Sequence, residues 1–289
     1  MKRVTYKQVN QLHIQGDYYA VNVKKAPLVI FIHGGGLIWG TSNDMKKAQR
    51  DFYLNAGYNV YSIEYRLAPE SKLPDIIRDI KDCMKWIYEL GAKELDFDPE
   101  NVAVVGSSAG GYLALTTGTF EAYRPKAIVS FYGYGNILGS WYTTPSRHFN
   151  KMTKVPEKLA QQLIQKSPTA SAPIEQRYAI YLFCRQQGKW LDYVTGLDPV
   201  IYRDHLRPFC PVDQIDEAYP PTLLLHGDAD EDVPYEESVQ MHKALQQHNI
   251  ESELITIKDG KHTFDYEDEK PVVQDAFKKV VSFLDSQFA

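Results

Sequence analysis

Residues 101–111 read Asn-Val-Ala-Val-Val-Gly-Ser-Ser-Ala-Gly-Gly, and this stretch decides the fold. Its first five residues form an apolar run rich in β-branched valine. Ser108 follows, with Gly106 two residues before it and Gly110 two residues after it. A helical pattern with Leu113 and Ala114 comes next. The order strand, G-x-S-x-G and helix predicts a sharp turn in which glycines leave room for a strained serine. Ser108 would then project from the carboxyl end of a strand.

Similar apolar runs lie on both sides of this stretch, with longer helical patterns between them. The runs cover residues 29–32, 59–63, 127–131, 222–225 and 253–257. This alternation predicts an α/β protein with a mostly parallel central sheet flanked by helices. We expect the helix before residue 101 to end at Gly91. The first 25 residues, with a strand at 18–23, are predicted to form an antiparallel edge.

The connection from residue 131 to residue 222 is far longer than the dozen or so residues that a crossover needs. It contains helical patterns of its own, which begin at Pro156 and Pro173, the second ending at Gly188. We therefore predict one domain over residues 1–289, with a helical cap inserted at 134–217 after the fourth strand of the apolar series. Aromatic residues are frequent in this cap. Most should form its core, while a few should line a substrate pocket.

Composition excludes several classes of protein. The 289 residues carry a net charge of −5 without a basic block, which argues against nucleic-acid binding. The apolar run at 26–32 is far shorter than the roughly 18 residues of a membrane span. No apolar segment follows the first residues, so we expect no secretion signal and a cytoplasmic protein. The three cysteines have no metal-ligand spacing, and we expect neither metal nor cofactor.

A glycine-rich loop follows the first apolar run of the series. It reads His33-Gly34-Gly35-Gly36, and consecutive glycines let backbone N–H groups turn toward a bound carbonyl oxygen. We predict the N–H groups of Gly35, Gly36 and Ala109 as donors to an oxyanion. The alternative is a phosphate-binding loop, but neither glycine pattern typical of one is present. We interpret His33 as a structural residue.

A nucleophilic serine needs a base and an acid that orients the base. The turn at 228–232 contains three aspartates, only one of which can take that role. His262 lies in the loop after the last strand of the series. The chain order serine, aspartate, histidine is that of α/β-hydrolases rather than of the chymotrypsin or subtilisin folds. Taken separately, the turn could be a solvated loop and His262 a surface residue.

Three motifs in combination carry a family resemblance. They are H-G-G-G at 33–36, E-Y-R-L-A-P-E at 64–70 and G-S-S-A-G-G at 106–111. With them the chain resembles the α/β-hydrolase superfamily and, within it, the hormone-sensitive-lipase-like esterases. Ser107 stands where that group usually has Asp, and the cap is inserted within the sheet. Both departures resemble bacterial carboxylesterases of the feruloyl and acetyl-xylan esterase kind.

The resemblance implies a role for each candidate residue. Ser108 matches the nucleophile, Asp230 the acid and His262 the base, while Gly35, Gly36 and Ala109 match the oxyanion hole.

The implied activity is hydrolysis of small or medium carboxylic esters through an acyl-enzyme. The expected partner is a small-molecule ester, and a homodimer is a common assembly in this group. One alternative is a serine peptidase of the prolyl-oligopeptidase type, against which the H-G-G-G and Y-R-L-A-P-E motifs argue. Another is a non-catalytic small-molecule binding protein, but such proteins lose the histidine that His262 supplies here.

Overall fold

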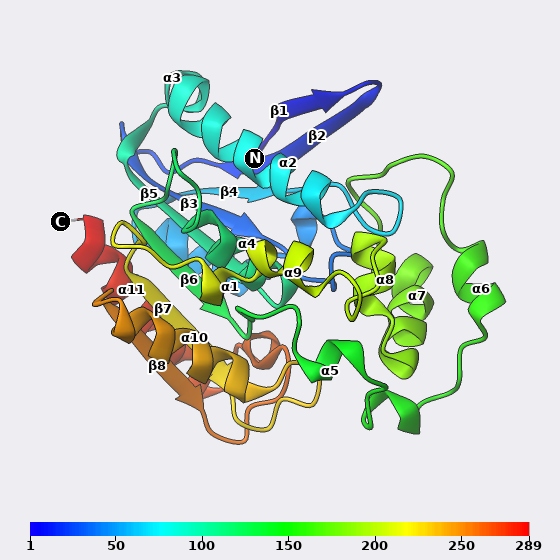
Figure 1. The fold of residues 1–289 in the computed structure, drawn as a ribbon. Coiled ribbons are helices and arrows are strands. Elements are labelled where there is room, and N and C mark those ends of the chain that lie inside the picture. Colours follow the sequence, from blue (N-terminus) through cyan, green and yellow to red (C-terminus); the bar gives the residue numbers. More distant parts are fainter. Residues whose placement is uncertain (289) are drawn as a thin grey trace.

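A single eight-stranded sheet forms the centre of the computed structural model, which describes residues 1–288. The strands are β1 (Lys2–Val9), β2 (Leu12–Tyr19), β3 (Ala26–Ile32), β4 (Asn59–Ile63), β5 (Phe97–Ser107), β6 (Ala127–Phe131), β7 (Thr222–Gly227) and β8 (Ser252–Ile257). Their order is β1-β2-β4-β3-β5-β6-β7-β8, and the six strands from β3 to β8 run parallel (Figure 1). The predicted α/β fold with a mostly parallel sheet is confirmed.

The first two strands pair antiparallel with each other, and β2 pairs antiparallel with β4, so they form the expected edge. The predicted strand at 18–23 is wrong in its second half, because β2 ends at Tyr19. There the chain turns out of the sheet: Val21 donates its N–H to the Asn59 side chain, and Val23 is exposed. A left-handed residue, Lys25, then leads into β3.

Helices cover both faces of the sheet. The α-helices outside the connection from β6 to β7 are α1 (Lys47–Asn55), α2 (Leu73–Trp86), α3 (Ala92–Leu95), α4 (Ala109–Thr117), α10 (Tyr235–Gln247) and α11 (Pro271–Phe288). α2, α4 and α10 pack on one face, while α1 and α11 contact each other on the opposite face (Figure 1). Two apolar cores result, because alternate strand residues point to opposite faces. No helix within residues 1–288 is long and apolar enough to span a membrane.

Gly91 does not end the helix that precedes β5, contrary to the prediction. After α2 the chain continues through a π-helical turn, Ile87–Gly91, and through α3. Gly91 keeps helical angles, and a Cβ there would lie 3.0 Å from the ring of Trp86. The glycine therefore permits close packing, and the left-handed residue that ends the helix is Asp96.

Between β6 and β7 the chain leaves the sheet and forms five short or medium helices. They are α5 (Ser140–Thr143), α6 (Glu157–Gln162), α7 (Ile174–Gln187), α8 (Trp190–Thr195) and α9 (Arg203–Leu206). α6 and α7 begin after Pro156 and Pro173, and α7 ends at Gly188, at the residues where the sequence predicts these boundaries. In Figure 1, α6, α7 and α8 lie together at one end of the sheet.

Candidate active site

Ser108 lies at the turn between β5 and α4, at the carboxyl end of the sheet. Its backbone has a φ of 56° and a ψ of −121°, an unusual conformation for a residue with a side chain. The glycines around it allow the turn. A Cβ at Gly106 would lie 2.1 Å from the Gly110 carbonyl oxygen, and one at Gly110 would lie 2.0 Å from that of Ile32. No side chain fits at either position, so the motif fixes the turn sterically.

His262 and Asp230 reach Ser108 from the loops that follow β8 and β7. The Ser108 Oγ and the His262 Nε2 are 3.1 Å apart, and the His262 Nδ1 donates to the Asp230 Oδ2 at 2.7 Å. The structure thus brings together the three residues that the sequence predicts as nucleophile, base and acid. With Nδ1 protonated, Nε2 is free to accept the serine proton.

Asp230 is fully buried and held from several sides. Its Oδ1 accepts the backbone N–H groups of Asp232 (2.8 Å) and Val233 (2.9 Å). A second imidazole, His226, has its Nε2 3.3 Å from the Asp230 Oδ2. Burial raises the pKa of the Asp230 carboxyl, but the charges and hydrogen bonds of His262 and His226 outweigh it and hold this pKa well below its usual range. Asp230 is therefore an anion at neutral pH.

The third aspartate of the same turn, Asp232, approaches the other side of His262. Its Oδ2 lies 3.9 Å from the His262 Nε2. Burial lowers the pKa of His262, while the charges of Asp232 and Asp230 and the hydrogen bond that His262 donates to Asp230 raise it, and the net shift is upward. The sequence does not indicate this second contact.

The glycine-rich loop faces Ser108 from the end of β3. Gly35 and Gly36 have φ values of 92° and 58°, which only glycine adopts readily. A Cβ at Gly36 would also lie 2.6 Å from the ring of Tyr181. The Gly36 carbonyl accepts the indole N–H of Trp190 at 2.8 Å, which fixes the peptide orientation. Ala109 is the first residue of α4, where a backbone N–H has no acceptor within the helix.

These groups surround a cavity of about 280 Å³. Ser108, His262, Gly35 and Gly36 line it. Other lining residues, which the sequence does not indicate as site residues, include Trp39, Asp44, Tyr132, Ile174, Asp232 and Tyr266. Tyr181, from the aromatic set of the predicted cap, is a lining residue as well.

His33 is structural, as the sequence predicts. It is fully buried, its Nδ1 donates to the Gly34 carbonyl at 2.9 Å, and its ring stacks on Tyr65 at 4.4 Å. Burial lowers the pKa of His33, which therefore stays neutral at pH 7.

Tyr132, directly after β6, packs its ring edge-on to His262 at 4.7 Å. Its hydroxyl donates to Asp265 at 2.6 Å, and burial raises the pKa of Asp265 to about 6. Asp265 begins the acidic run Asp-Tyr-Glu-Asp-Glu at 265–269, a pattern typical of a solvated segment before a helix. Its carboxyl is nevertheless buried, with the Tyr132 hydroxyl as a hydrogen-bond donor.

The E-Y-R-L-A-P-E motif holds the surroundings of the cavity in place. Arg66 pairs with the buried Asp79 at 2.8 Å. Glu70 is buried and accepts from Arg177 of α7 at 2.9 Å, and the same guanidinium donates to the Ala68 carbonyl at 2.7 Å. This ion pair fastens α7, and with it Tyr181, to the core of the molecule.

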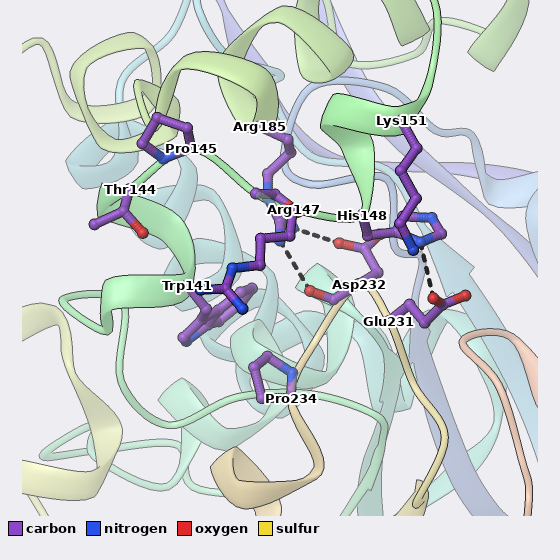
Figure 2. Close-up of a pocket in the computed structure, with 11 residues that line it drawn as sticks. Trp141, Thr144, Pro145, Arg147, His148, Lys151, Arg185, Glu231, Asp232 and Pro234 are labelled. Atoms are coloured by element: carbon purple, nitrogen blue, oxygen red, sulfur yellow. Dashed lines mark hydrogen bonds and ion pairs between the residues drawn. The ribbon is translucent and has the colours of Figure 1, made fainter.

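A second cavity, of about 420 Å³, adjoins the first at Asp232. Figure 2 shows Arg185 contacting Asp232, while His148 pairs with Glu231 at 3.2 Å. Arg147 and Lys151 also line this cavity. The Asp232–Arg185 pair thus lies between the cavity at Ser108 and a more basic one.

Comparisons with known proteins place this geometry in a family. The BD-FAE family model matches residues 17–245, which include Ser108 and Asp230 and end before His262. Among curated proteins, the non-reducing polyketide synthase ausA of Aspergillus calidoustus is 27% identical over 92% of this chain. The chain spans only 13% of the length of that protein.

Solved structures share the fold over nearly the whole chain. A Staphylococcus aureus Mu50 protein of unknown function has a TM-score of 0.79 and 25% identity, covering 100% of this chain and 99% of its own. An α/β-hydrolase superfamily protein from Enterococcus faecalis has a TM-score of 0.72 and 23% identity, covering 94% of this chain and 95% of its own. Thermogutta terrifontis esterase 2, phosphonylated by cyclosarin, has a TM-score of 0.71 and 19% identity, covering 99% of this chain and 93% of its own. The family model covers most of the sequence, and the chain therefore belongs to BD-FAE, an α/β-hydrolase esterase family.

Proposed function

We propose that the protein is a serine carboxylesterase that hydrolyses small or medium esters through an acyl-enzyme. The observation that carries the proposal is the pair of contacts that link Ser108 through His262 to Asp230. The membership of an esterase family supports the reaction class. The cavity of about 280 Å³ suits a small substrate group.

The first half of the reaction acylates Ser108. His262 Nε2 takes the hydroxyl proton as the Ser108 Oγ attacks the ester carbonyl, and Asp230 stabilises the imidazolium that forms. The N–H groups of Gly35, Gly36 and Ala109 donate to the oxyanion. The imidazolium then gives its proton to the leaving alcohol.

The second half releases the acid. A water molecule gives a proton to His262 Nε2 and attacks the acyl carbonyl, and the returning proton restores the Ser108 hydroxyl. Every proton passes through the same imidazole nitrogen, so the position of that nitrogen between Ser108 and the leaving group is decisive.

Hydrolysis of p-nitrophenyl acetate by the purified protein tests the proposal. We expect Ser108→Ala to abolish turnover, and Ser286→Ala, a hydroxyl loss on the exposed part of α11, to retain it. A matched peptide amide should be hydrolysed far more slowly than the ester. Unchanged ester turnover in Ser108→Ala would refute the nucleophile, and a preference for the amide would favour a peptidase.

A further inference from the structure

Asp232 presents an unused carboxylate oxygen next to the reacting groups. Its Oδ1 accepts the Tyr181 hydroxyl at 2.6 Å and contacts Arg185. Its Oδ2 lies 3.9 Å from the His262 Nε2 and has no hydrogen-bond donor among residues 1–288. The side chain is 18% exposed and lines the catalytic cavity, so this oxygen can meet a bound substrate.

The rest of the cavity wall is also suited to positive charge. Asp44 supplies a second carboxylate, and the described wall contains no Lys or Arg side chain. His33 is neutral, and its Nε2 is a buried acceptor without a partner in the described chain. Five rings of Phe, Trp and Tyr, whose faces attract cations, complete the wall: Phe31, Trp39, Tyr132, Tyr181 and Tyr266.

Two cations of the protein lie around this cavity rather than in its wall. Arg185 is buried behind Asp232 and offsets part of its charge. Lys46 stands over the ring of Tyr266 at 3.8 Å and lines a neighbouring cavity. The Oδ2 of Asp232 nevertheless lies on the Nε2 side of His262. A substrate group bound beside Nε2 is therefore closer to this negative oxygen than to either cation.

The position of Asp232 places its carboxylate beside the alcohol part of a bound ester. In the proposed reaction the leaving oxygen receives a proton from the His262 Nε2, so it lies within about 3 Å of that nitrogen. The Asp232 Oδ2 is 3.9 Å from the same nitrogen. A group two or three bonds beyond the leaving oxygen can therefore reach it.

We propose that Asp232 is a specificity-determining residue that selects esters whose alcohol carries a cationic nitrogen two or three bonds beyond the ester oxygen. Such substrates are esters of amino alcohols. The inference rests on the proposed esterase function and adds the charge of the alcohol to it. Attraction to the carboxylate is strong because the cavity is partly shielded from water, and a negatively charged alcohol is repelled.

The test compares acetate esters of matched shape. Acetylcholine carries the cation, 3,3-dimethylbutyl acetate is its neutral isostere, acetoxyacetate is anionic and glycerol monoacetate is a neutral hydrogen-bond donor. We expect kcat/KM for acetylcholine to exceed that of the isostere at least tenfold, with acetoxyacetate the slowest. Asp232→Asn should bring the ratio of acetylcholine to isostere close to one. Asp275→Asn removes an exposed carboxylate of α11 and should keep the wild-type ratio.

Each outcome decides a different point. If neither p-nitrophenyl acetate nor any of the four acetate esters is hydrolysed, the proposed esterase function fails. If it is hydrolysed as fast as acetylcholine, the inference is overturned. Faster hydrolysis of acetoxyacetate overturns it in favour of an alcohol that reaches Arg147 and Lys151, and an equal gain with glycerol monoacetate overturns it in favour of a neutral donor.

Should Asp232→Asn fail to fold, inhibition of the wild-type protein answers the same question. We expect choline to inhibit competitively at a concentration at least tenfold lower than 3,3-dimethylbutanol. Equal inhibition by the two alcohols would overturn the inference.

Discussion

Replacing the two aspartates that flank His262, one at a time, tests which carboxylate orients the imidazole. Asp230→Asn keeps the size of the side chain and removes a charge that contacts Nδ1 at 2.7 Å. The amide N–H₂ can turn toward Nδ1 and favour the tautomer in which Nε2 carries the proton and cannot accept one from Ser108. We expect kcat to fall about 10⁴-fold, which corresponds to about 5 kcal/mol of transition-state stabilisation.

Asp232→Asn should cost far less. Two unit charges 3.9 Å apart interact by about 4 kcal/mol at an effective dielectric constant of 20, and the contact between Arg185 and Asp232 offsets part of this energy. The charge of Asp232 raises the pKa of His262, which favours the imidazolium of the transition state but also protonates the resting base, so its loss has opposing effects. We expect less than a tenfold change in kcat for a neutral ester.

The assay is kcat for p-nitrophenyl acetate in both variants, with circular dichroism and urea unfolding to verify that each is folded. A larger loss in Asp232→Asn than in Asp230→Asn would refute the reasoning, because it would assign the orienting role to the wrong carboxylate.

Three further predictions concern pH and stability. The pKa of His262 is raised above 6.5 and the base must be neutral, so kcat/KM should fall as pH drops through this raised value. Asp232→Asn should move this fall of the pH profile to lower pH, and an unmoved profile would contradict the explanation. Arg177→Met leaves Glu70 buried without its cation and should cost about 3–5 kcal/mol in urea unfolding, largely recovered by adding Glu70→Leu; an additive loss in the double variant would contradict the ion-pair explanation. Burial raises the pKa of Asp265 to about 6, so its contribution to stability is fully present below about pH 4 and is lost as pH rises through 6. Asp265→Asn should therefore stabilise the protein at pH 7 by about 3 kcal/mol in the same assay, and a destabilised variant would contradict the assignment.

The sequence predicts the central sheet well because each buried parallel strand is a short continuous apolar run. The runs at 59–63 and 127–131 coincide with β4 and β6. Local turn chemistry is equally legible, since the glycines around Ser108 are required by backbone contacts within a few ångströms. Residues that lie at strand ends of a parallel sheet meet at one edge, which is why Ser108, Asp230 and His262 are found together.

Other features depend on tertiary contacts that a single sequence does not reveal. Gly91 has the pattern of a helix end, yet the packing of Trp86 keeps it within a helical segment. Asp265 lies in an acidic run that resembles a solvated helix start, yet the hydroxyl of Tyr132 holds it inside. The partners of Asp232 come from α7, 47 and 51 residues away, and no local pattern connects them.

Covalent labelling with a fluorophosphonate tests the central claim most directly. The proposed nucleophile is activated only while His262 and Asp230 hold their contacts, so the reagent should modify Ser108 once per chain. Mass spectrometry of the labelled peptide, alongside residual hydrolysis of p-nitrophenyl acetate, gives the site and its link to activity. We predict a single adduct at Ser108 and a loss of hydrolysis in proportion to labelling. Stoichiometric labelling of another residue, or full activity in protein labelled at Ser108, would contradict the account.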